Sequence, residues 1–204
     1  MSVVINYKNS SLKRNQANTV FFVDENFNIN GLKKDISKTE FSYISDLLKT
    51  SDLKKNLLFF EINSKKKIFL ISIKKDLKTS DVENLGAKFH GYIDYDKKKD
   101  YFVNSDTINS KIKNFVGYFL HGIKLKSYEF NIYKSKKNTK IVFINVIGNK
   151  NKISSQDQLR FKALEEGTFF ARDLVSEPGN ILHPDEYAKR INSLKKFGLK
   201  INIY

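Results

Sequence analysis

The two prolines of this 204-residue sequence stand six positions apart, and they constrain the fold more than any other feature. Pro178 cannot continue a helix and disfavours helical angles at the residue before it, whereas Pro184 suits the first position of a new helix. Asp185 and Glu186 then fall in the first turn of that helix, where its dipole attracts negative charge. The stretch Gly167–Ala188 is therefore predicted to form a helix, a stiff elbow and a second helix.

The helix before the elbow is predicted to bury one face. Its small and apolar residues recur at the three- and four-residue spacing of a helix that packs on one side. These residues are Ala163, Leu164, Gly167, Phe170, Ala171 and Leu174. The charged residues of the same segment fall mostly on the opposite side, which indicates exposure to solvent there.

Upstream of the elbow, apolar segments of strand length alternate with segments of helical periodicity, and this alternation predicts an α/β fold. The predicted strands are Val3–Tyr7, Thr19–Val23, Asn56–Ile62, Lys67–Ile73, Tyr101–Val103, Tyr128–Tyr133 and Lys140–Val146. The predicted helices are the second half of Leu32–Leu53, a segment from Ser80 to about Gly91, and a segment from Asp106 or Thr107 to Ile123.

The sheet-forming part gives way to the long helix near residues 148–155, and this change predicts the domain organisation. We expect an α/β domain over residues 1–150, a linker helix over 151–176, and the beginning of a second α/β domain over 177–204. In the third part a helix over Pro184–Phe197 and a strand over Lys200–Tyr204 are predicted. Because the apolar alternation of that strand has only begun at Tyr204, we expect the second domain to be truncated.

The formal net charge of +15 has two interpretations, and residues 1–150 carry +13 of it. A basic surface can serve nucleic acid or an anionic membrane. Only four of the 37 basic residues are arginines, the type that reads bases best. The lysines form short, scattered runs at Lys65–Lys67, Lys74–Lys75, Lys97–Lys99 and Lys136–Lys137. We therefore favour a solvated surface, and keep a basic nucleic-acid-binding module as the alternative function.

Several kinds of chemistry are excluded by composition and pattern. The absence of cysteine excludes disulfides, thiolate metal sites and a cysteine nucleophile. The first residues lack the basic start and apolar core of a signal peptide, and no apolar run approaches the roughly 18 residues of a membrane span. Phosphate-binding glycine loops and the nucleophile elbow of hydrolases are also missing. We expect no membrane partner.

The remaining candidate residues favour structural roles. None of the three histidines, His90, His121 and His183, has a partner at metal-ligand spacing, and the first two are expected to be structural. His183 lies in the elbow, where it could order the loop or contact a neighbour. Other residues considered are the acidic cluster Asp94, Asp96 and Asp100, interpreted as a solvated loop, and the aromatic pairs Phe21-Phe22 and Phe59-Phe60, interpreted as core rather than as a stacking platform.

The fourteen residues from Ala171 to Pro184, ARDLVSEPGNILHP, resemble the opening of the catalytic domain in cytosolic leucyl aminopeptidases, a family of metallopeptidases. In that family a helix ending in a DLV motif leads into a Pro-x-Asn loop and a proline-capped helix. A variable, macro-domain-like α/β domain and a linking helix come before it. Three positions depart from the family pattern: Ser176 replaces an asparagine, Glu177 a small residue, and Gly179 a second proline.

The resemblance implies that the parent protein is a cytoplasmic metallo-aminopeptidase. It would release N-terminal residues such as leucine from peptides, use two divalent metal ions (manganese or zinc), and assemble as a homo-hexamer. The family's catalytic segments, a lysine-bearing VGKG segment and an NTDAEGR segment, do not occur here. We therefore expect an inactive N-terminal fragment with no catalytic, metal-binding or substrate-binding residue. An ADP-ribose-binding function is disfavoured by the missing glycine-rich loops.

Overall fold

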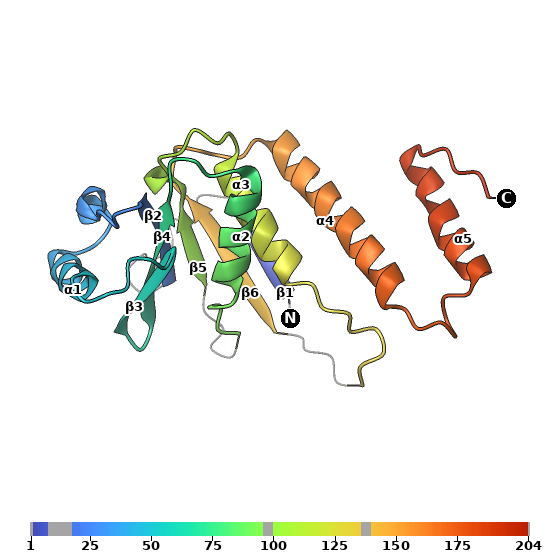
Figure 1. Ribbon diagram of the computed structural model, residues 1–204, viewed down its shortest axis with the longest axis horizontal. Coiled ribbons are helices and arrows are strands. Elements are labelled where there is room, and N and C mark those ends of the chain that lie inside the picture. Colours follow the sequence, from blue (N-terminus) through green and yellow to red (C-terminus); the bar gives the residue numbers. More distant parts are fainter. Residues whose placement is uncertain (1, 8–17, 96–99, 136–139, 204) are drawn as a thin grey trace.

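A six-stranded sheet forms the centre of the protein, with the strand order β1-β6-β5-β2-β4-β3 (Figure 1). The computed structural model describes residues 2–7, 18–95, 100–135 and 140–203. The strands are β1 (Ser2–Asn6), β2 (Asn18–Asp24), β3 (Leu57–Asn63), β4 (Lys66–Ile73), β5 (Tyr101–Asn104) and β6 (Ile141–Ile147). All neighbours pair in parallel except β3 and β4, which form an antiparallel hairpin. The predicted α/β class is thereby confirmed.

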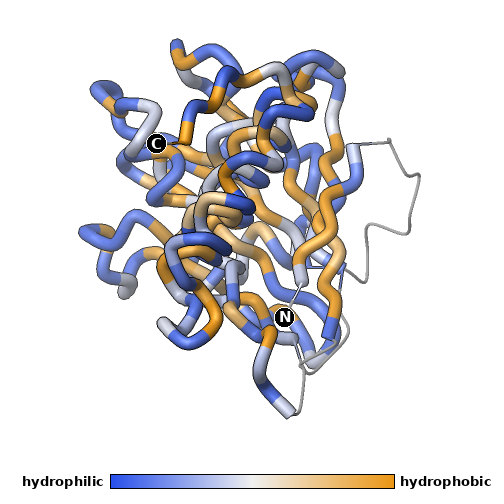
Figure 2. Tube along the Cα trace, turned by 90° about the vertical axis from the view of Figure 1, so that its right-hand side faces the viewer, coloured by the Kyte–Doolittle hydropathy of each residue, from blue (hydrophilic) through white to orange (hydrophobic). Residues whose placement is uncertain are grey.

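Helices cover the two faces of the sheet unequally. The helices α2 (Thr79–His90) and α3 (Phe115–Lys126) pack on one face of the sheet. The core beneath them contains side chains from all six strands, with only Leu57 from β3. The 3-10 helix η2 (Asn30–Lys34) and α1 (Lys38–Leu48) cover β2 and β4 on the other face. Figure 2 shows hydrophobic residues along the strands and hydrophilic residues on the outer helices.

Two glycines let α2 and α3 approach closely. A Cβ on Gly86 would lie 1.9 Å from the carbonyl oxygen of Phe119, and a Cβ on Gly122 would lie 1.9 Å from that of Glu83. Neither distance is sterically possible, so only glycine permits this crossing. The close crossing brings side chains of α2 within reach of α3.

The arrangement predicted from the two prolines, a helix, an elbow and a second helix, is confirmed. The helix α4 (Ser155–Ser176) ends before Pro178, and α5 (Pro184–Asn192) begins with proline at its first position. The 3-10 helix η4 (Ser193–Phe197) extends α5 and ends at Gly198, whose φ of 85° requires glycine. Figure 1 shows α4 beside α3, and α5 beyond α4 at the far end of the molecule.

Three predicted elements differ from the structure. Tyr128–Tyr133 is not a strand, because the hydroxyls of its two end residues bind carboxylates at the end of α4. Residues 200–203 are also not a strand, since no neighbouring strand pairs with them. The helix expected from Asp106 begins only at Phe115, and Ser105–Thr107 forms the 3-10 helix η3 instead. The helix predicted from Ser80 begins at Thr79, and the carboxylate of Asp81 in its first turn accepts the backbone N–H of Lys78.

The buried face predicted for α4 is wrong. Leu174 is buried, but Leu164 is 46% exposed, and Ala163, Gly167 and Ala171 are exposed as well. The side that packs on the sheet domain carries Phe161, Glu165, Phe169 and Arg172. Charged residues face inward there because the domain supplies partners: Lys124 binds Glu165 at 2.9 Å, and Arg172 donates to the carbonyl oxygen of Leu125 at 2.5 Å.

Candidate functional site

The carboxyl edge of the sheet is the first place to look for a site, because open α/β sheets bind ligands where successive crossovers leave to opposite faces. Here that point lies between β2, which is followed by η2 and α1, and β5, which is followed by α3. The strands separate beyond Val20 and Val103, the last pair in register. The hydroxyl of Thr107 fills the opening by accepting the N–H of Phe22 at 2.9 Å. The crevice is therefore closed by the chain itself.

The same edge contains a backbone cradle suited to an anion. The N–H groups of Asn149 and Lys150 both point at one oxygen of Asp106, at 2.7 and 2.6 Å. Gly148, with φ of 115°, makes room, because a Cβ there would lie 2.9 Å from the Asp106 carboxylate. Burial alone would raise the pKa of Asp106, but these two N–H groups hold it below its ordinary value. An internal carboxylate thus already occupies the two backbone donors of this cradle, which could otherwise bind an external anion.

The elbow forms the second candidate, a joint of three side chains. Glu177, just after α4, accepts a hydrogen bond from the hydroxyl of Tyr133 and pairs with Arg190 of α5 at 2.8 Å. Arg190 also binds Glu186 at 3.0 Å within α5. The Glu177 side chain is only 2% exposed within these contacts. Its hydrogen bonds with Tyr133 and then with Arg190 lower its pKa, so it is a carboxylate at neutral pH.

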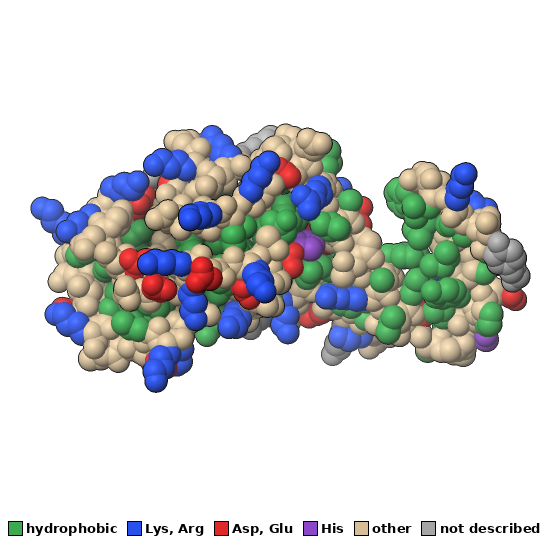
Figure 3. Space-filling view, turned by 45° about the horizontal axis from the view of Figure 1, so that its top comes forward, with side chains coloured by type: hydrophobic (Ala, Val, Ile, Leu, Met, Phe, Trp, Pro, Cys, Tyr) green, Lys and Arg blue, Asp and Glu red, His purple; other side chains and the backbone are tan. Residues whose placement is uncertain are grey.

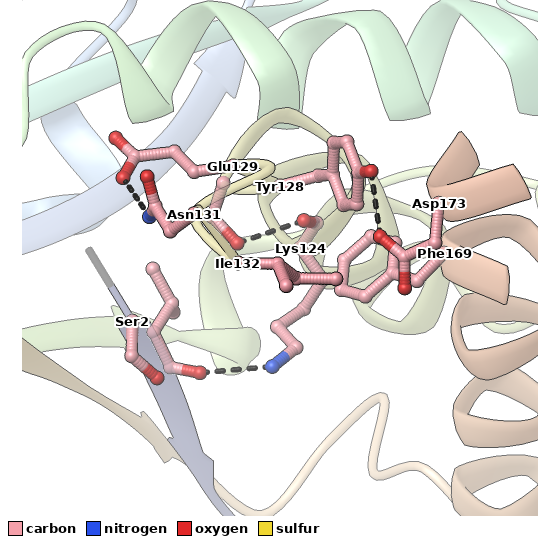
Figure 4. A pocket seen from close by; sticks show the side chains of 10 residues that line it. Ser2, Lys124, Tyr128, Glu129, Asn131, Ile132, Phe169 and Asp173 are labelled. Atoms are coloured by element: carbon pink, nitrogen blue, oxygen red, sulfur yellow. Dashed lines mark hydrogen bonds between the residues drawn. The ribbon is translucent and has the colours of Figure 1, made fainter. Parts of the chain in front are cut away.

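A second set of contacts holds the C-terminal end of α4, one turn before Glu177. Tyr128 donates to Asp173 at 2.7 Å, and both line a cavity of about 400 Å³ beside the start of β1 (Figure 4). Inside it the ammonium of Lys124 donates to the carbonyl oxygen of Val3 at 2.9 Å. Most polar groups that Figure 4 labels pair with one another. We therefore interpret the cavity as part of the packing contact between α3 and α4.

The histidines lie apart from one another. His90 accepts or donates a hydrogen bond with the hydroxyl of Tyr95 at 2.7 Å, and burial, with Lys126 nearby, lowers its pKa. His121 binds the carboxylate of Glu83 at 2.8 Å in the middle of α3 rather than near its end. His183 is exposed before α5, and its side chain makes no hydrogen bond to any described residue.

Two of the three clustered acidic residues fall in the described part of the chain. Asp94 and Asp100 are half-buried, while Asp96 lies outside the described residues. Within the described ranges, no group of three or more His, Asp or Glu side chains is placed to hold a metal ion. That no catalytic, metal-binding or substrate-binding residue lies in this chain stays a prediction.

Two lysines of the one fully described triple run, Lys66 and Lys67, are paired with carboxylates. Lys66 is buried and binds Glu40 at 2.7 Å, and Lys67 binds Glu61 at 2.6 Å. The runs 97–99 and 136–137 lie outside the described residues. On the face drawn in Figure 3, basic side chains are scattered among acidic and apolar ones. Paired and dispersed lysines of this kind are typical of a solvated surface.

The aromatic pairs are almost entirely core. Phe21, Phe22 and Phe60 are buried, as predicted. Phe59 is the exception: it lies on β3 at the edge of the sheet, 42% exposed, with the Tyr92 ring 5.4 Å away. A single exposed pair is too small for the successive stacking that single-stranded nucleic acid requires.

Comparison with known sequences finds aminopeptidases. No protein-family profile matches the chain. A probable cytosol aminopeptidase of Clostridium perfringens is 31% identical over 116 residues, covering 53% of this chain and 24% of that protein. Probable cytosol aminopeptidases of Phytoplasma mali and Methylorubrum extorquens are 34% and 35% identical over 118 and 88 residues. The match to the Phytoplasma mali protein covers 53% of this chain and 23% of that protein. The match to the Methylorubrum extorquens protein covers 42% of this chain and 18% of that protein. The matches thus span about a quarter or less of these relatives.

Comparison with solved structures gives the same fold. A tomato leucine aminopeptidase mutant superposes with a TM-score of 0.68 at 16% identity, over 96% of this chain and 42% of that one. The cytosol aminopeptidase of Coxiella burnetii gives 0.64 at 12% identity, over 98% and 39%. The predicted resemblance to leucyl aminopeptidases is confirmed, and the partial coverage fits an N-terminal portion. Nothing in either comparison favours the nucleic-acid alternative.

Proposed function

We propose that this chain is the N-terminal part of a cytosolic leucyl aminopeptidase, in which residues 1–150 form a peripheral domain, 151–176 a linker helix and 177–204 the start of the catalytic domain. The proposal is supported by the similarity to probable cytosol aminopeptidases over about half of the chain. It is also supported by a fold shared with leucine aminopeptidases over nearly all of it.

One structural observation carries the proposal: the segment after the elbow exposes large apolar side chains and builds no core among its described residues. Among its described residues, α5 buries none of its side chains. Its large exposed apolar residues are Ile181, Tyr187, Phe197, Leu199 and Ile203. In Figure 3 hydrophobic side chains gather on the side of this lobe that faces the rest of the protein. Exposed apolar surface of this extent marks a contact surface, as expected of a domain of which only the first elements are present.

The joint at Glu177 gives this part of the chain a role in the proposed enzyme. By binding Tyr133 of the first domain and Arg190 of α5, Glu177 fixes the direction in which the chain enters the second domain. The elbow would position the catalytic domain and take no part in the chemistry.

The chemistry itself is proposed for the complete protein. Two divalent metal ions would polarise the scissile carbonyl and activate a water molecule. One structural neighbour, a bottromycin maturation enzyme, was solved in complex with Mn, which supports a dependence on divalent metal and leaves manganese and zinc as the two proposed ions. A peptide substrate, a homo-hexameric assembly and a cytoplasmic location belong to the same proposal. No helix in the described part of the chain is long and apolar enough to cross a membrane.

The test compares two proteins: the 204-residue chain and the full product of the reading frame that contains it. Both are stripped with a chelator and assayed for hydrolysis of leucine p-nitroanilide with and without added Mn²⁺. We expect Mn²⁺-dependent hydrolysis by the full product and none by the 204-residue chain. Activity of the shorter chain would contradict the domain assignment. A metal-loaded full product without activity, or a reading frame that ends at Tyr204, would contradict the function.

A further inference from the structure

The strand β1 lies at one end of the sheet, where it pairs with β6 alone among the described strands. Ser2 donates its N–H to the carbonyl oxygen of Lys140 at 3.0 Å, so the backbone groups of Ser2 face β6. Because alternate residues of a strand face the same neighbour, Val4 also faces β6, whereas Val3 and Ile5 face away from it. β1 therefore presents backbone donors and acceptors along an open edge.

A contact at Val3 agrees with this orientation. Its carbonyl oxygen accepts a hydrogen bond from the ammonium of Lys124 at 2.9 Å, on the side away from β6. In the described part of the chain, the N–H of Val3 and both backbone groups of Ile5 have no hydrogen-bond partner. The two residues are about 7 Å apart along the strand, the distance at which an extended backbone repeats its own groups. The open edge is thus complementary to a further strand.

A cavity of about 700 Å³ runs along this edge, and we call it the β1 groove. Residues 2–5 line one side of it, and the first half of α4 lines the other. Figure 1 shows β1 as the strand nearest α4. The helix is held in place by Phe161, whose ring packs on Gly117 of α3 so closely that a Cβ there would lie 2.1 Å from it. The groove is therefore already formed in the folded chain.

The remaining lining of the β1 groove is apolar or carries paired charges. Lys124 binds Glu165 at 2.9 Å, and Lys162 lies 3.7 Å from Glu166. The charged side chains of the described lining thus have partners within the protein, which favours an uncharged occupant. The apolar side chains that α3 and α4 contribute are Leu120, Leu159 and Phe161.

The position of α4 also limits the size of the occupant. Neighbouring strands of a sheet lie about 4.7–4.9 Å apart, so a single extended segment can lie beside β1. A second copy of this chain would bring a whole sheet to the edge, because each of its strands is continuous with further strands and helices. The helix α4 stands where those elements would have to lie. The β1 groove therefore suits a single strand better than a second sheet.

From these observations we infer that the β1 groove binds an extended, uncharged peptide segment of another protein, which adds a strand to the sheet. The backbone of the segment pairs with Val3 and Ile5, and its alternate apolar side chains contact Leu120, Leu159 and Phe161. The side chains between them point to the opposite face of the sheet. The inference concerns the 204-residue chain alone, so it is tested independently of the proposed aminopeptidase activity.

The experiment adds a short capped peptide of alternating valine and threonine to the 204-residue chain and follows the backbone amides by NMR. We expect saturable shifts at the amides of Val3 and Ile5, and hydrogen exchange at least about tenfold slower there at saturation. The amide of Val4 should not change, because it already faces β6. Phe59 lies on β3 at the opposite end of the sheet, and its amide is the reference for general adhesion of the peptide.

A second peptide separates backbone pairing from apolar contact alone. It has the same side chains but is methylated at every backbone nitrogen, so it has no N–H to donate. We expect it to bind at least about tenfold more weakly than the first peptide.

Two variants locate the site. Leu159→Glu places a charge without a partner on the apolar wall of the β1 groove, and Leu164→Glu places the same charge on the same helix outside the lining. We expect the first to weaken binding of the peptide at least about fivefold and the second to leave it unchanged.

Several outcomes would overturn the inference. They are the absence of saturable binding, equal slowing of exchange at Val4 or Phe59, equal binding of the methylated peptide, and equal effects of the two variants. Sedimentation of the chain without peptide tests the remaining occupant. Self-association that slows exchange at Val3 and Ile5 would assign the edge to a second copy and overturn the inference as well.

Discussion

Arg190 of α5 donates to Oε1 of Glu177 at 2.8 Å, across the elbow that contains Pro178 and Pro184. This ion pair links two helices that otherwise meet through seven residues of loop. Tyr133 binds the same carboxylate from the first domain. The direction of α5 is therefore set by one side chain with two partners rather than by a hydrophobic core.

Replacing Glu177 should loosen the elbow without unfolding the domain. Glu177→Gln removes the charge that Arg190 binds, and no buried side chain of α5 compensates. We expect faster amide exchange and faster protease cleavage within residues 178–192, with the exchange of α2 and α3 unchanged. Glu186→Gln is the matched control, because Glu186 also binds Arg190 at 3.0 Å but lies within α5. Equal acceleration in both variants would show that Glu177 has no special role.

The elbow and the positions of most strands could be predicted from sequence because their causes are local. Proline restricts its own backbone and that of its neighbour, and strands such as Ile141–Ile147 are dense in β-branched residues. The role of Glu177 could not be predicted. Arg190 is thirteen residues away, and Tyr133 is forty-four residues away. Only the pair Glu186 and Arg190, four residues apart, leaves a signal in a helical sequence.

Two of the errors have a common physical reason: a tertiary partner replaced a local preference. Tyr128–Tyr133 has strand-forming residues, yet its hydroxyls bind α4 instead of its backbone joining the sheet. The inner face of α4 includes Glu165 and Arg172, which periodicity assigns to solvent. The cradle around Asp106 is equally invisible in sequence, since its donors are backbone groups more than forty residues away.

The close crossing of α2 and α3 predicts opposite effects for two glycine substitutions. Gly122→Ala would force apart backbones that now meet at Glu83, so we expect a loss of about 1–3 kcal/mol in the free energy of unfolding. Gly167→Ala, on the exposed side of α4, has nothing within 4 Å of the new methyl group and should gain about 0.5–1 kcal/mol. Urea unfolding of the two variants and the parent measures both. A stable Gly122→Ala variant would contradict the close crossing.

The ion pair between Lys66 and Glu40 should matter to stability because it is buried. Lys66→Ala leaves the carboxylate enclosed without its partner, and we expect a loss of about 3–5 kcal/mol at pH 7. The exposed pair of Lys49 and Asp46 is the control, and Lys49→Ala should cause no measurable change. Comparable losses in both variants would contradict this account.

The same pair predicts a pH dependence. Burial alone would raise the pKa of Glu40, but hydrogen bonds from Lys66 and Ser37 hold it below its ordinary value of 4.5. A lowered folded-state pKa means that this stabilisation is complete above the ordinary value and is lost as pH falls through the lowered one. The stability difference between the parent and Glu40→Gln should therefore be constant from pH 6 to 8 and shrink below about pH 4. Urea titrations at several pH values measure it, and a difference that persists in acid would contradict the assignment.

Removing the internal anion at the carboxyl edge should create a requirement for an external one. In Asp106→Ala the N–H groups of Asn149 and Lys150 lose their acceptor, so the melting temperature should fall. Phosphate can enter the vacated cradle, which exists only in the folded state. Because phosphate then binds the folded and not the unfolded protein, it raises the melting temperature by mass action. We expect phosphate, compared with chloride at equal ionic strength, to stabilise Asp106→Ala more than it stabilises the parent. Asp46→Ala, which removes an equal charge from an exposed site, controls for the general effect of phosphate on a basic protein. If phosphate raises the melting temperatures of both variants equally, Asp106 does not occupy an anion site.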